Sequence, residues 1–287
     1  MLFNGTPVVI KAVSHPEKLP RVSVDSPITE VAALQLLQQR HGKHHPNVSH
    51  LLDCFQDQDC VYLVLPFLSG GDLYSFMEAR DGEGVPEDQV ARYLHQIASG
   101  LLYMKQAGIA HHDLSLENLM FTDSKCKTVK IIDLGMCINV PTAGWPADGY
   151  SSPCGGWQPQ SPVLVTQHGC YGKPGYVAPE VVREEACDPF ASDIWSLGVL
   201  LYTMLTGRPL YNSPHDQSFK IMAYGGVKDV VKVYEDCGLR LSPCAKDLIC
   251  MMLNNKPNKR PTVEDVLRHP FVLSHLVGAH DSAASVG

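Results

Sequence analysis

The chain has 287 residues, 45% of them hydrophobic and 18% charged, which fits one large globular domain or two lobes and excludes a disordered or fibrous protein. Its 23 lysines and arginines against 30 aspartates and glutamates give a net charge of −7, which argues against a nucleic-acid partner. No apolar run approaches the ~18 to 20 residues of a membrane-spanning helix, and no secretory signal is readable. We therefore expect a cytoplasmic protein, or a nuclear one, that does not insert into membranes.

The first part of the chain predicts a small sheet with one helix. Asn4-Gly5, between apolar pairs, predicts a tight hairpin turn. Apolar residues at helical spacing predict a short amphipathic helix over Thr29–Gln39. Two strand-like runs, Leu51–Phe55 and Val61–Phe67, are separated by a polar turn and predict a second antiparallel hairpin.

After Ser69-Gly70-Gly71 helical patterns dominate the sequence. The expected helices cover 72–80, 87–106, 191–206, 242–253 and 262–268. A segment rich in Pro, Gly and Ser, 138–167, predicts a long loop, and the small polar residues of 278–287 predict a frayed tail. The change in character places a boundary between two lobes near 66–71.

Several short motifs follow one another in a fixed order. They are Val9-Ile10-Lys11, Glu30, the run His111-His112-Asp113-Leu114-Ser115-Leu116-Glu117-Asn118, Asp133-Leu134-Gly135, Ala178-Pro179-Glu180, Asp193-Ile194-Trp195-Ser196-Leu197-Gly198 and Arg260-Pro261-Thr262. Each tripeptide is common by itself, whereas the order and spacing together resemble the protein kinase family over residues 1 to 273.

The resemblance implies a bilobal α+β fold of the protein-kinase type. Its small, β-rich N-lobe would cover 1–66, the hinge 66–71, and the larger, mainly helical C-lobe 72–273. A long activation segment would span 133–180 within the C-lobe, and 274–287 would form a tail. We expect a monomer whose partner is a protein substrate.

The resemblance also implies transfer of the γ-phosphoryl group of Mg-ATP to a serine or threonine hydroxyl of a protein. Such a reaction requires charge neutralisation and alignment of the reactants. Lys11, directed by Glu30, would contact the phosphates of ATP, and Asp113 would orient the substrate hydroxyl. Asn118 and Asp133 offer the oxygen ligands that Mg²⁺ prefers. Taken singly, Lys11 and Glu30 could form a surface ion pair, Asp133 a turn, and Asp113 and Asn118 a helix cap or Asx turn. The joint occurrence of these residues in one order disfavours these alternatives.

Other matched positions concern the adenine pocket and the core. Leu65 would gate the pocket, and Phe67 and Leu68, after Pro66, would form the hinge. The positions that would stack as an apolar column between the lobes are Leu34, Leu51, His111 and Leu134. Asp193 would anchor the loop that holds Asp113, and Glu180 would form a buried ion pair with Arg260.

The sequence departs from the family pattern at the phosphate-binding loop and at the motif that holds Asp113. No G-x-G-x-x-G occurs among the 287 residues, so we expect a truncated N-lobe and weak binding of ATP by this chain. His112 stands where the family has an arginine that grips an activation-loop phosphate. We therefore expect activity without phosphorylation of the long loop, where Ser161 and Thr166 are the candidate sites.

Two further positions carry exchanged residue types. Ser115 stands where serine/threonine kinases have a lysine, and Lys173 stands where they have a threonine. Because a lysine stem is flexible, Lys173 could place its ammonium at the reaction centre, in contact with Ser115. The alternative is a solvated loop lysine.

Two other functions compete with a serine/threonine protein kinase. A pseudokinase or scaffold would keep the fold and act by binding proteins, and nucleotide binding separates it from an enzyme. A small-molecule phosphotransferase is disfavoured by Ala178-Pro179-Glu180 and by the helices that follow it.

Overall fold

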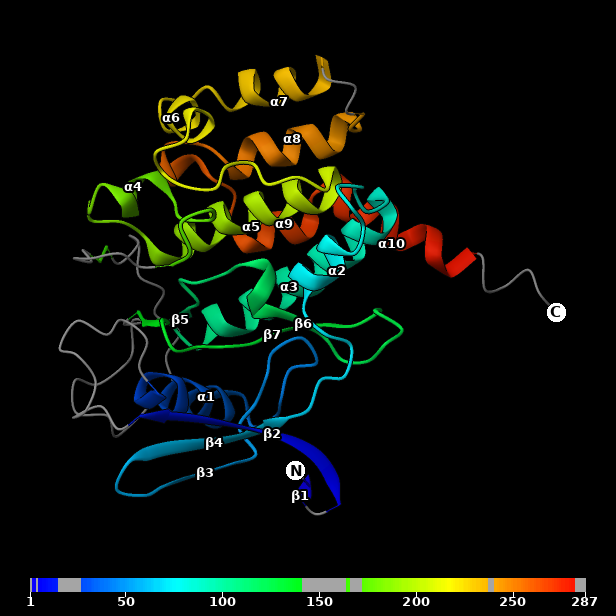
Figure 1. Cartoon of the computed structure of the whole chain (residues 1–287). Coiled ribbons are helices and arrows are strands. Elements are labelled where there is room, and N and C mark those ends of the chain that lie inside the picture. Colours follow the sequence, from blue (N-terminus) through cyan, green and yellow to red (C-terminus); the bar gives the residue numbers. More distant parts are fainter. Residues whose placement is uncertain are drawn as a thin grey trace, which may run out of the picture.

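The computed structural model of the chain describes residues 2–3, 5–14, 27–140, 164–165, 172–236 and 240–281. A sheet and one helix form the lower part of the molecule in Figure 1, and helices form the upper part. The predicted loop over 138–167 lies largely outside the described residues, as do Ser161 and Thr166. The described residues thus include both predicted lobes and the segment that joins them.

The sheet of the lower part is antiparallel, and its strand order is β1-β2-β4-β3. These strands are β1 (Leu2–Phe3), β2 (Thr6–Ser14), β3 (Asp53–Gln56) and β4 (Cys60–Pro66). Gly5 adopts a φ of +80° between β1 and β2, which glycine does at little cost. Both predicted hairpins are therefore confirmed.

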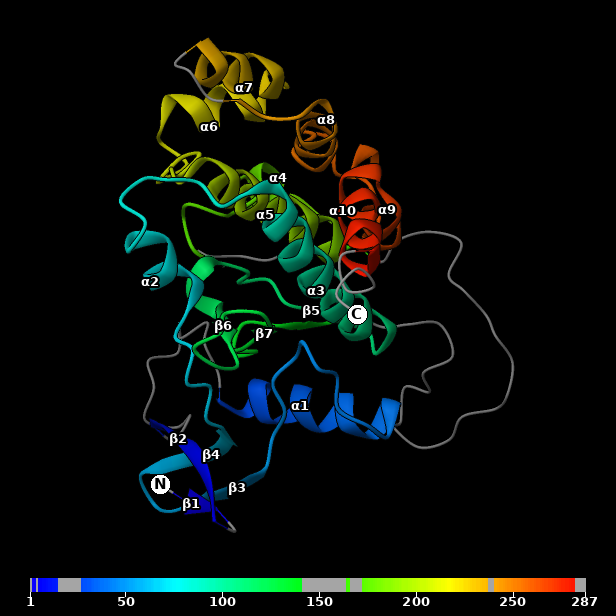
Figure 2. The ribbon, with the colours of Figure 1, turned by 90° about the vertical axis from the view of Figure 1, so that its right-hand side faces the viewer.

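Helix α1 (Pro27–His41) lies between this sheet and the helical part (Figures 1 and 2). Ala33, Leu34 and Leu37 are buried on one face, as the helical spacing of the apolar residues predicts. The helix is longer than the predicted 29–39 by two residues at each end. Glu30, in its first turn, is also buried, and a buried carboxylate requires a partner.

The helical part is built around α3 and α5, whose buried side chains include Leu94 and Trp195. Its elements are α2 (Leu73–Glu78), α3 (Glu87–Gln106), α4 (Pro179–Val182), α5 (Pro189–Thr206), α6 (Gln217–Ala223), α7 (Val227–Asp236), α8 (Pro243–Met252), α9 (Val263–Arg268), α10 (Pro270–Asp281) and the 3₁₀ turns η2 (Leu116–Asn118) and η3 (Pro257–Lys259). The five helices predicted here are confirmed with small shifts of their ends, while α4, α6, α7 and α10 were not predicted.

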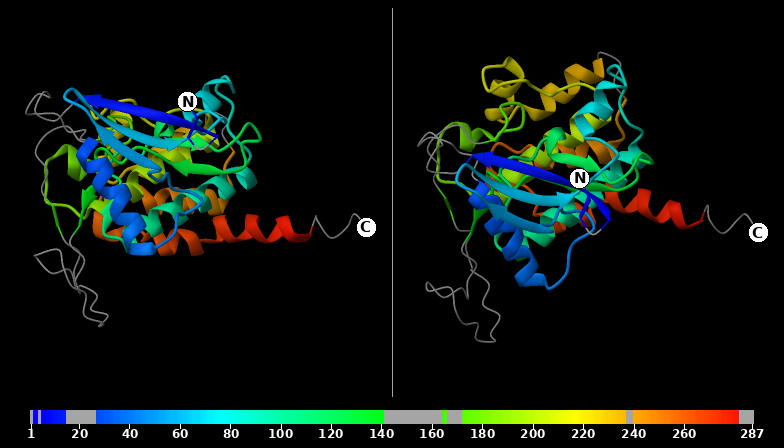
Figure 3. Two further views of the ribbon diagram at one scale, coloured as in Figure 1. Left: turned by 90° about the horizontal axis from the view of Figure 1, so that it is seen from below. Right: turned by 60° about the horizontal axis from the view of Figure 1, so that its bottom comes forward.

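The predicted frayed tail is wrong in its first residues, because α10 continues to Asp281. Phe271 and Val272 bury the start of this helix in the core, which supports the turns that follow. Figures 1 and 3 show α10 leaving the body of the molecule and ending in the direction of the C-terminus. In the described residues no helix is both long and apolar enough to span a bilayer.

Two short antiparallel ladders lie between α1 and the helices (Figure 1). Strand β5 (Ile109–Ala110) pairs with β8 (Ile138–Asn139), and β6 (Leu119–Phe121) pairs with β7 (Val129–Ile131). The ladders fix both ends of two loops, residues 111–118 and 132–137. These loops carry the candidate catalytic residues.

Candidate active site

Lys11 on β2 joins the sheet, α1 and the loop after β7. Its ammonium lies 2.8 Å from Glu30 Oε2 and 3.0 Å from Asp133 Oδ1. The other oxygen of Glu30, Oε1, accepts a hydrogen bond of 3.4 Å from the backbone N–H of Leu134. The structure thus brings together three of the residues singled out from the sequence.

Burial and the neighbouring opposite charges shift the pKa values of Lys11 and Glu30 in opposite directions. Burial lowers the pKa of Lys11, but Glu30 and Asp133 outweigh it, and the pKa ends above the ordinary value. Burial raises the pKa of Glu30, and Lys11 offsets this effect only in part. Lys11 therefore remains a cation, and its position is fixed by two carboxylates from different segments.

Asp193 on α5 anchors the loop 111–118. The Asp193 carboxylate accepts hydrogen bonds from the backbone N–H groups of His111 (2.7 Å) and His112 (2.8 Å). Burial raises the pKa of Asp193 to about 6, against the effect of these two donors. The bonds hold His112 at a φ of +66°, a conformation that residues other than glycine rarely adopt. The predicted anchoring role of Asp193 fits this geometry.

Asp113 is oriented by the loop itself. The side-chain amide of Asn118 donates to the carbonyl oxygen of Asp113 (2.7 Å) and to its carboxylate Oδ2 (2.8 Å). The backbone N–H of Lys173 also donates a hydrogen bond to the carboxylate. Burial raises the pKa of Asp113, while His111 and these donors oppose the increase. The carboxylate is therefore preorganised, and a raised pKa suits a group that handles a proton.

His111 connects Asp113 to the loop that carries Asp133. Its Nδ1 accepts a hydrogen bond of 3.2 Å from the backbone N–H of Asp113, and its Nε2 lies 3.1 Å from the carbonyl oxygen of Ile132. The backbone N–H of Ile132 donates to the carbonyl oxygen of Asn118 at 3.0 Å. Asp113, Asn118 and Asp133 consequently belong to one hydrogen-bonded unit.

Asn118 and Asp133 fit the ligand preferences of Mg²⁺. Both bonds that the Asn118 amide nitrogen makes point to Asp113, which leaves the amide oxygen Oδ1 for a cation. Asp133 adopts a φ of +59°, and its Oδ1 also accepts a bond of 3.2 Å from the N–H of Gly135. One carboxylate and one amide oxygen form a hard-oxygen donor set, as this ion requires.

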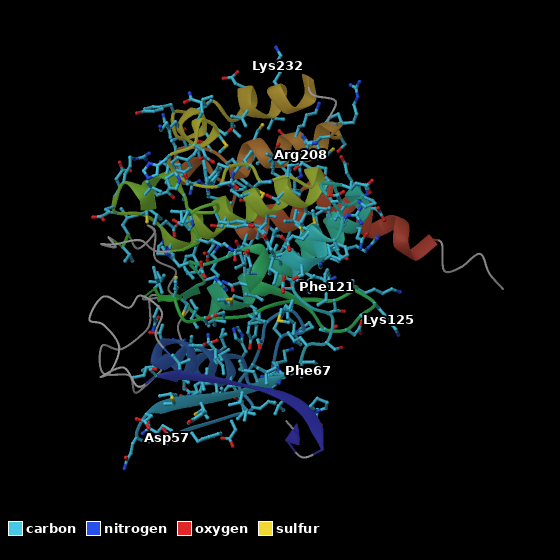
Figure 4. The ribbon with its side chains drawn as sticks, in the orientation of Figure 1. Asp57, Phe67, Phe121, Lys125, Arg208 and Lys232 are labelled. Atoms are coloured by element: carbon cyan, nitrogen blue, oxygen red, sulfur yellow. The ribbon has the colours of Figure 1, made fainter. Side chains whose placement is uncertain are left out.

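The predicted hinge follows directly on β4. Val9 pairs with Leu65 across the sheet, and the N–H of Phe67 donates to the carbonyl oxygen of Pro7 at 3.4 Å. Phe67 is half exposed and Leu68 is buried. Figure 4 shows Phe67 at the end of the sheet, between it and the helical part. Their role in binding adenine stays a prediction.

The predicted column positions are buried or nearly so. Leu34, His111 and Leu134 are no more than 3% exposed, and Leu51 is partly buried against the same core. Apolar packing therefore runs from α1 to the loops of the helical part.

The predicted position of the Lys173 ammonium is wrong. The ammonium forms an ion pair with Glu117 and lies 5.6 Å from the centre of the Tyr74 ring, not at Ser115 or at the Asp113 carboxylate. Ser115 is buried in the loop. The physical reason is that Glu117 offers a carboxylate, which binds an ammonium more strongly than the Ser115 hydroxyl does. Glu117 lies in the same loop as Ser115, but no signal in the sequence distinguishes its carboxylate from that of Asp113 as the partner of Lys173.

The predicted ion pair between Glu180 and Arg260 is present. Two hydrogen bonds of 2.6 and 2.7 Å join the carboxylate to the guanidinium, and neither side chain is more than 2% exposed. Arg260 also donates to the carbonyl oxygens of Ala191 and Asn254, both at 2.8 Å. This pair stabilises the C-lobe by joining α4 to the segment before α9.

A comparison with protein families agrees with this geometry. The model of the protein kinase domain matches residues 3–272. The chain therefore belongs to the protein kinase family, and its small strand-rich part and larger helical part are the two lobes of that fold.

The similar proteins are serine/threonine kinases. A calcium and calcium/calmodulin-dependent serine/threonine-protein kinase of Lilium longiflorum is 34% identical over 230 residues, which cover 80% of this chain and 39% of the relative. The serine/threonine-protein kinase PLK4 of Drosophila virilis is 33% identical over 229 residues, covering 80% and 26%. The crystal structure of Rad53 1-466 in complex with AMP-PNP aligns with a TM-score of 0.64 at 28% identity and covers 93% of this chain and 58% of the other. The kinase domain of this chain is thus of the serine/threonine type.

Proposed function

We propose that the chain is a protein kinase that transfers the γ-phosphoryl group of Mg-ATP to serine or threonine hydroxyls of a protein substrate. The observation that carries the proposal is the joint arrangement of Lys11, Glu30 and Asp133 with the hydrogen-bonded unit of Asp113 and Asn118. Two parts of the chain distant in sequence converge here on a cation, an acceptor for a proton and two oxygen ligands. Phosphoryl transfer requires these groups together.

Each residue has a distinct part in this reaction. Lys11 supplies positive charge for the phosphates, and Glu30 keeps its ammonium in place. The Asp113 carboxylate accepts the hydrogen bond of the substrate hydroxyl, orients its oxygen for attack and takes its proton as the bond to phosphorus forms. Asn118 holds Asp113 and, with Asp133, would hold Mg²⁺. When bound, that ion neutralises charge on the phosphate oxygens.

The relatives support ATP as the nucleotide and a serine or threonine hydroxyl as the acceptor. The Rad53 structure holds AMP-PNP, and the curated relatives carry the name of serine/threonine kinases. Because the chain spans less than two thirds of the length of each, the particular protein substrate is not transferred from them.

The experiment that tests the proposal compares the chain with Asp133→Asn and with Asp123→Asn as the matched control. Asp123 is an exposed aspartate outside the site. We expect the wild type and the control to phosphorylate a serine-containing protein such as casein in the presence of Mg²⁺. We expect Asp133→Asn to lose roughly 10²-fold or more in turnover, since it removes a charged ligand.

Nucleotide binding is measured in the same samples with a fluorescent ATP analogue. Mg²⁺-dependent binding without transfer by the wild type would overturn the proposal and favour a pseudokinase. Equal turnover by Asp133→Asn would overturn the role of the site.

A further inference from the structure

A groove of about 460 Å³ opens beside the loop 111–118, between α2, residues 173–176 and α5. Most of its wall is apolar or aromatic and includes Tyr74, Met77, Leu116, Pro174 and Tyr211. Its charged groups are the carboxylates of Glu78 and Glu117 and the ammonium of Lys173. We call this space the α2–α5 groove.

The groove is continuous with the candidate active site. Lys173 lines the groove, and its backbone N–H donates a hydrogen bond to the Asp113 carboxylate. The neighbouring Gly172 lies so close that a methyl group on its Cα would be 2.9 Å from the carbonyl oxygen of His112. Lys173 therefore borders both the Asp113 carboxylate and the groove, so a polypeptide that presents a hydroxyl to Asp113 can place a neighbouring side chain in the groove.

The two carboxylates of the groove already have partners within the chain. Glu78 accepts a hydrogen bond of 2.9 Å from the Tyr74 hydroxyl. Glu117 forms the ion pair with Lys173, whose ammonium also faces the Tyr74 ring. The second oxygen of Glu117, Oε2, is shielded from solvent and accepts no hydrogen bond, so this carboxylate depends on Lys173 for compensation of its charge.

We propose that Lys173 is a specificity-determining residue: its ammonium neutralises Glu117 from within the chain, so that the α2–α5 groove accepts an uncharged apolar side chain of the substrate and disfavours a basic one. This inference rests on the proposed function and names the class of substrate for that site. A basic side chain would have to displace Lys173 or lie beside a second cation, and either costs free energy. An apolar side chain meets the apolar wall and leaves the ion pair intact.

Removing the charge of Lys173 should change the preference of the groove. Lys173→Met keeps the stem and the backbone N–H that bonds Asp113, and removes only the charge. Glu117 is then a partly buried carboxylate without a cation, and a basic substrate side chain becomes its best partner. The preference between a basic and an apolar substrate should therefore shift toward the basic one.

The test uses serine-centred peptides in which one of the five positions on either side of the serine is arginine or leucine, one position at a time. The arginine-to-leucine ratio of kcat/KM is measured for the wild type, Lys173→Met, Glu117→Gln and the double variant. At the position that meets the groove, we expect the wild type to prefer leucine. We expect Lys173→Met to raise the ratio about two- to fivefold, the effect of one partly exposed ion pair.

The double variant, which has neither charge, should return the ratio toward that of the wild type. Lys125→Met is the matched control, because Lys125 is exposed on the turn between β6 and β7 (Figure 4), and its ratio should not change. An unchanged ratio in Lys173→Met at every position would overturn the proposal. So would an equal increase in the double variant.

Peptide binding, measured by fluorescence anisotropy, tests the role of Lys173 independently of the proposed kinase activity. A shift toward the arginine peptide in the binding of Lys173→Met supports the groove even if no variant transfers phosphate. Turnover that depends on Asp113, without any shift in the preference between the arginine and leucine peptides, would refute the role of Lys173 and leave the proposed function intact.

Discussion

Removing the charge of Arg260 should strongly destabilise the C-lobe. The guanidinium and the Glu180 carboxylate share two hydrogen bonds of 2.6 and 2.7 Å and are almost fully buried. Arg260→Met leaves Glu180 buried without its cation, and the loss of one partner of such a pair costs about 3 to 5 kcal/mol. The Arg260 guanidinium also lies 5.0 Å from the centre of the Trp195 ring, a contact that Met keeps only in part. We therefore expect a loss toward the upper end of that range.

The free energy of unfolding is measured by urea denaturation of the wild type, Arg260→Met, Glu180→Gln and the double variant. Arg183→Met is the control, since its ion pair with Glu185 is exposed and should contribute no more than about 0.5 kcal/mol. We expect the double variant to be more stable than the sum of the single losses indicates. A loss below about 1 kcal/mol in Arg260→Met, or strict additivity, would refute the reasoning.

Three further predictions concern the site. Glu30→Gln should lower kcat/KM for ATP about 10- to 100-fold, because Lys11 loses a charged hydrogen-bond partner; an unchanged value in steady-state kinetics would contradict this. Burial lowers the pKa of His112 to about 4 from its ordinary 6.5, so unfolding takes up a proton as the pH falls below 6.5, and stability decreases. Between pH 7.5 and pH 5 this loss is about 2 kcal/mol, and urea titrations of His112→Asn should show a correspondingly smaller decrease. Gly172→Ala should reduce turnover because its φ is +77° and the new methyl meets the His112 carbonyl, whereas Gly42→Ala, with a φ of +65° and open space, should cost only about 1 kcal/mol of stability.

Hydrophobic periodicity predicted the long elements well. Helix α3 begins at Glu87 and ends at Gln106 as predicted, because a twenty-residue amphipathic pattern has few alternatives. The four residues of α4 are too few to show a helical repeat of apolar residues. Helices α6 and α7 lie in largely polar segments and bury only one narrow face, so their helical signal in the sequence is weak. The end of α10 depends on packing of Phe271, which no local pattern reveals.

The site could be predicted where backbone position decides the geometry. Lys11 and Glu30 face each other because a rigid strand and a rigid helix present them, and the resemblance to the kinase family was sufficient to pair them. The direction of the Lys173 side chain could not be predicted, because its flexible stem reaches several acceptors from one Cα. Only the three-dimensional arrangement shows that Glu117 is the acceptor, and with it the groove that both residues line.

The central claim is that Asp113 accepts the proton of a substrate hydroxyl during phosphoryl transfer. The most direct measurement is single-turnover transfer from Mg-ATP to a serine peptide by the wild type and Asp113→Asn, with nucleotide affinity determined in parallel. Asn keeps the shape and removes the charge, so we expect the transfer rate to fall roughly 10²- to 10⁴-fold while the affinity for nucleotide changes less than about threefold. Transfer by Asp113→Asn at the rate of the wild type would contradict the account.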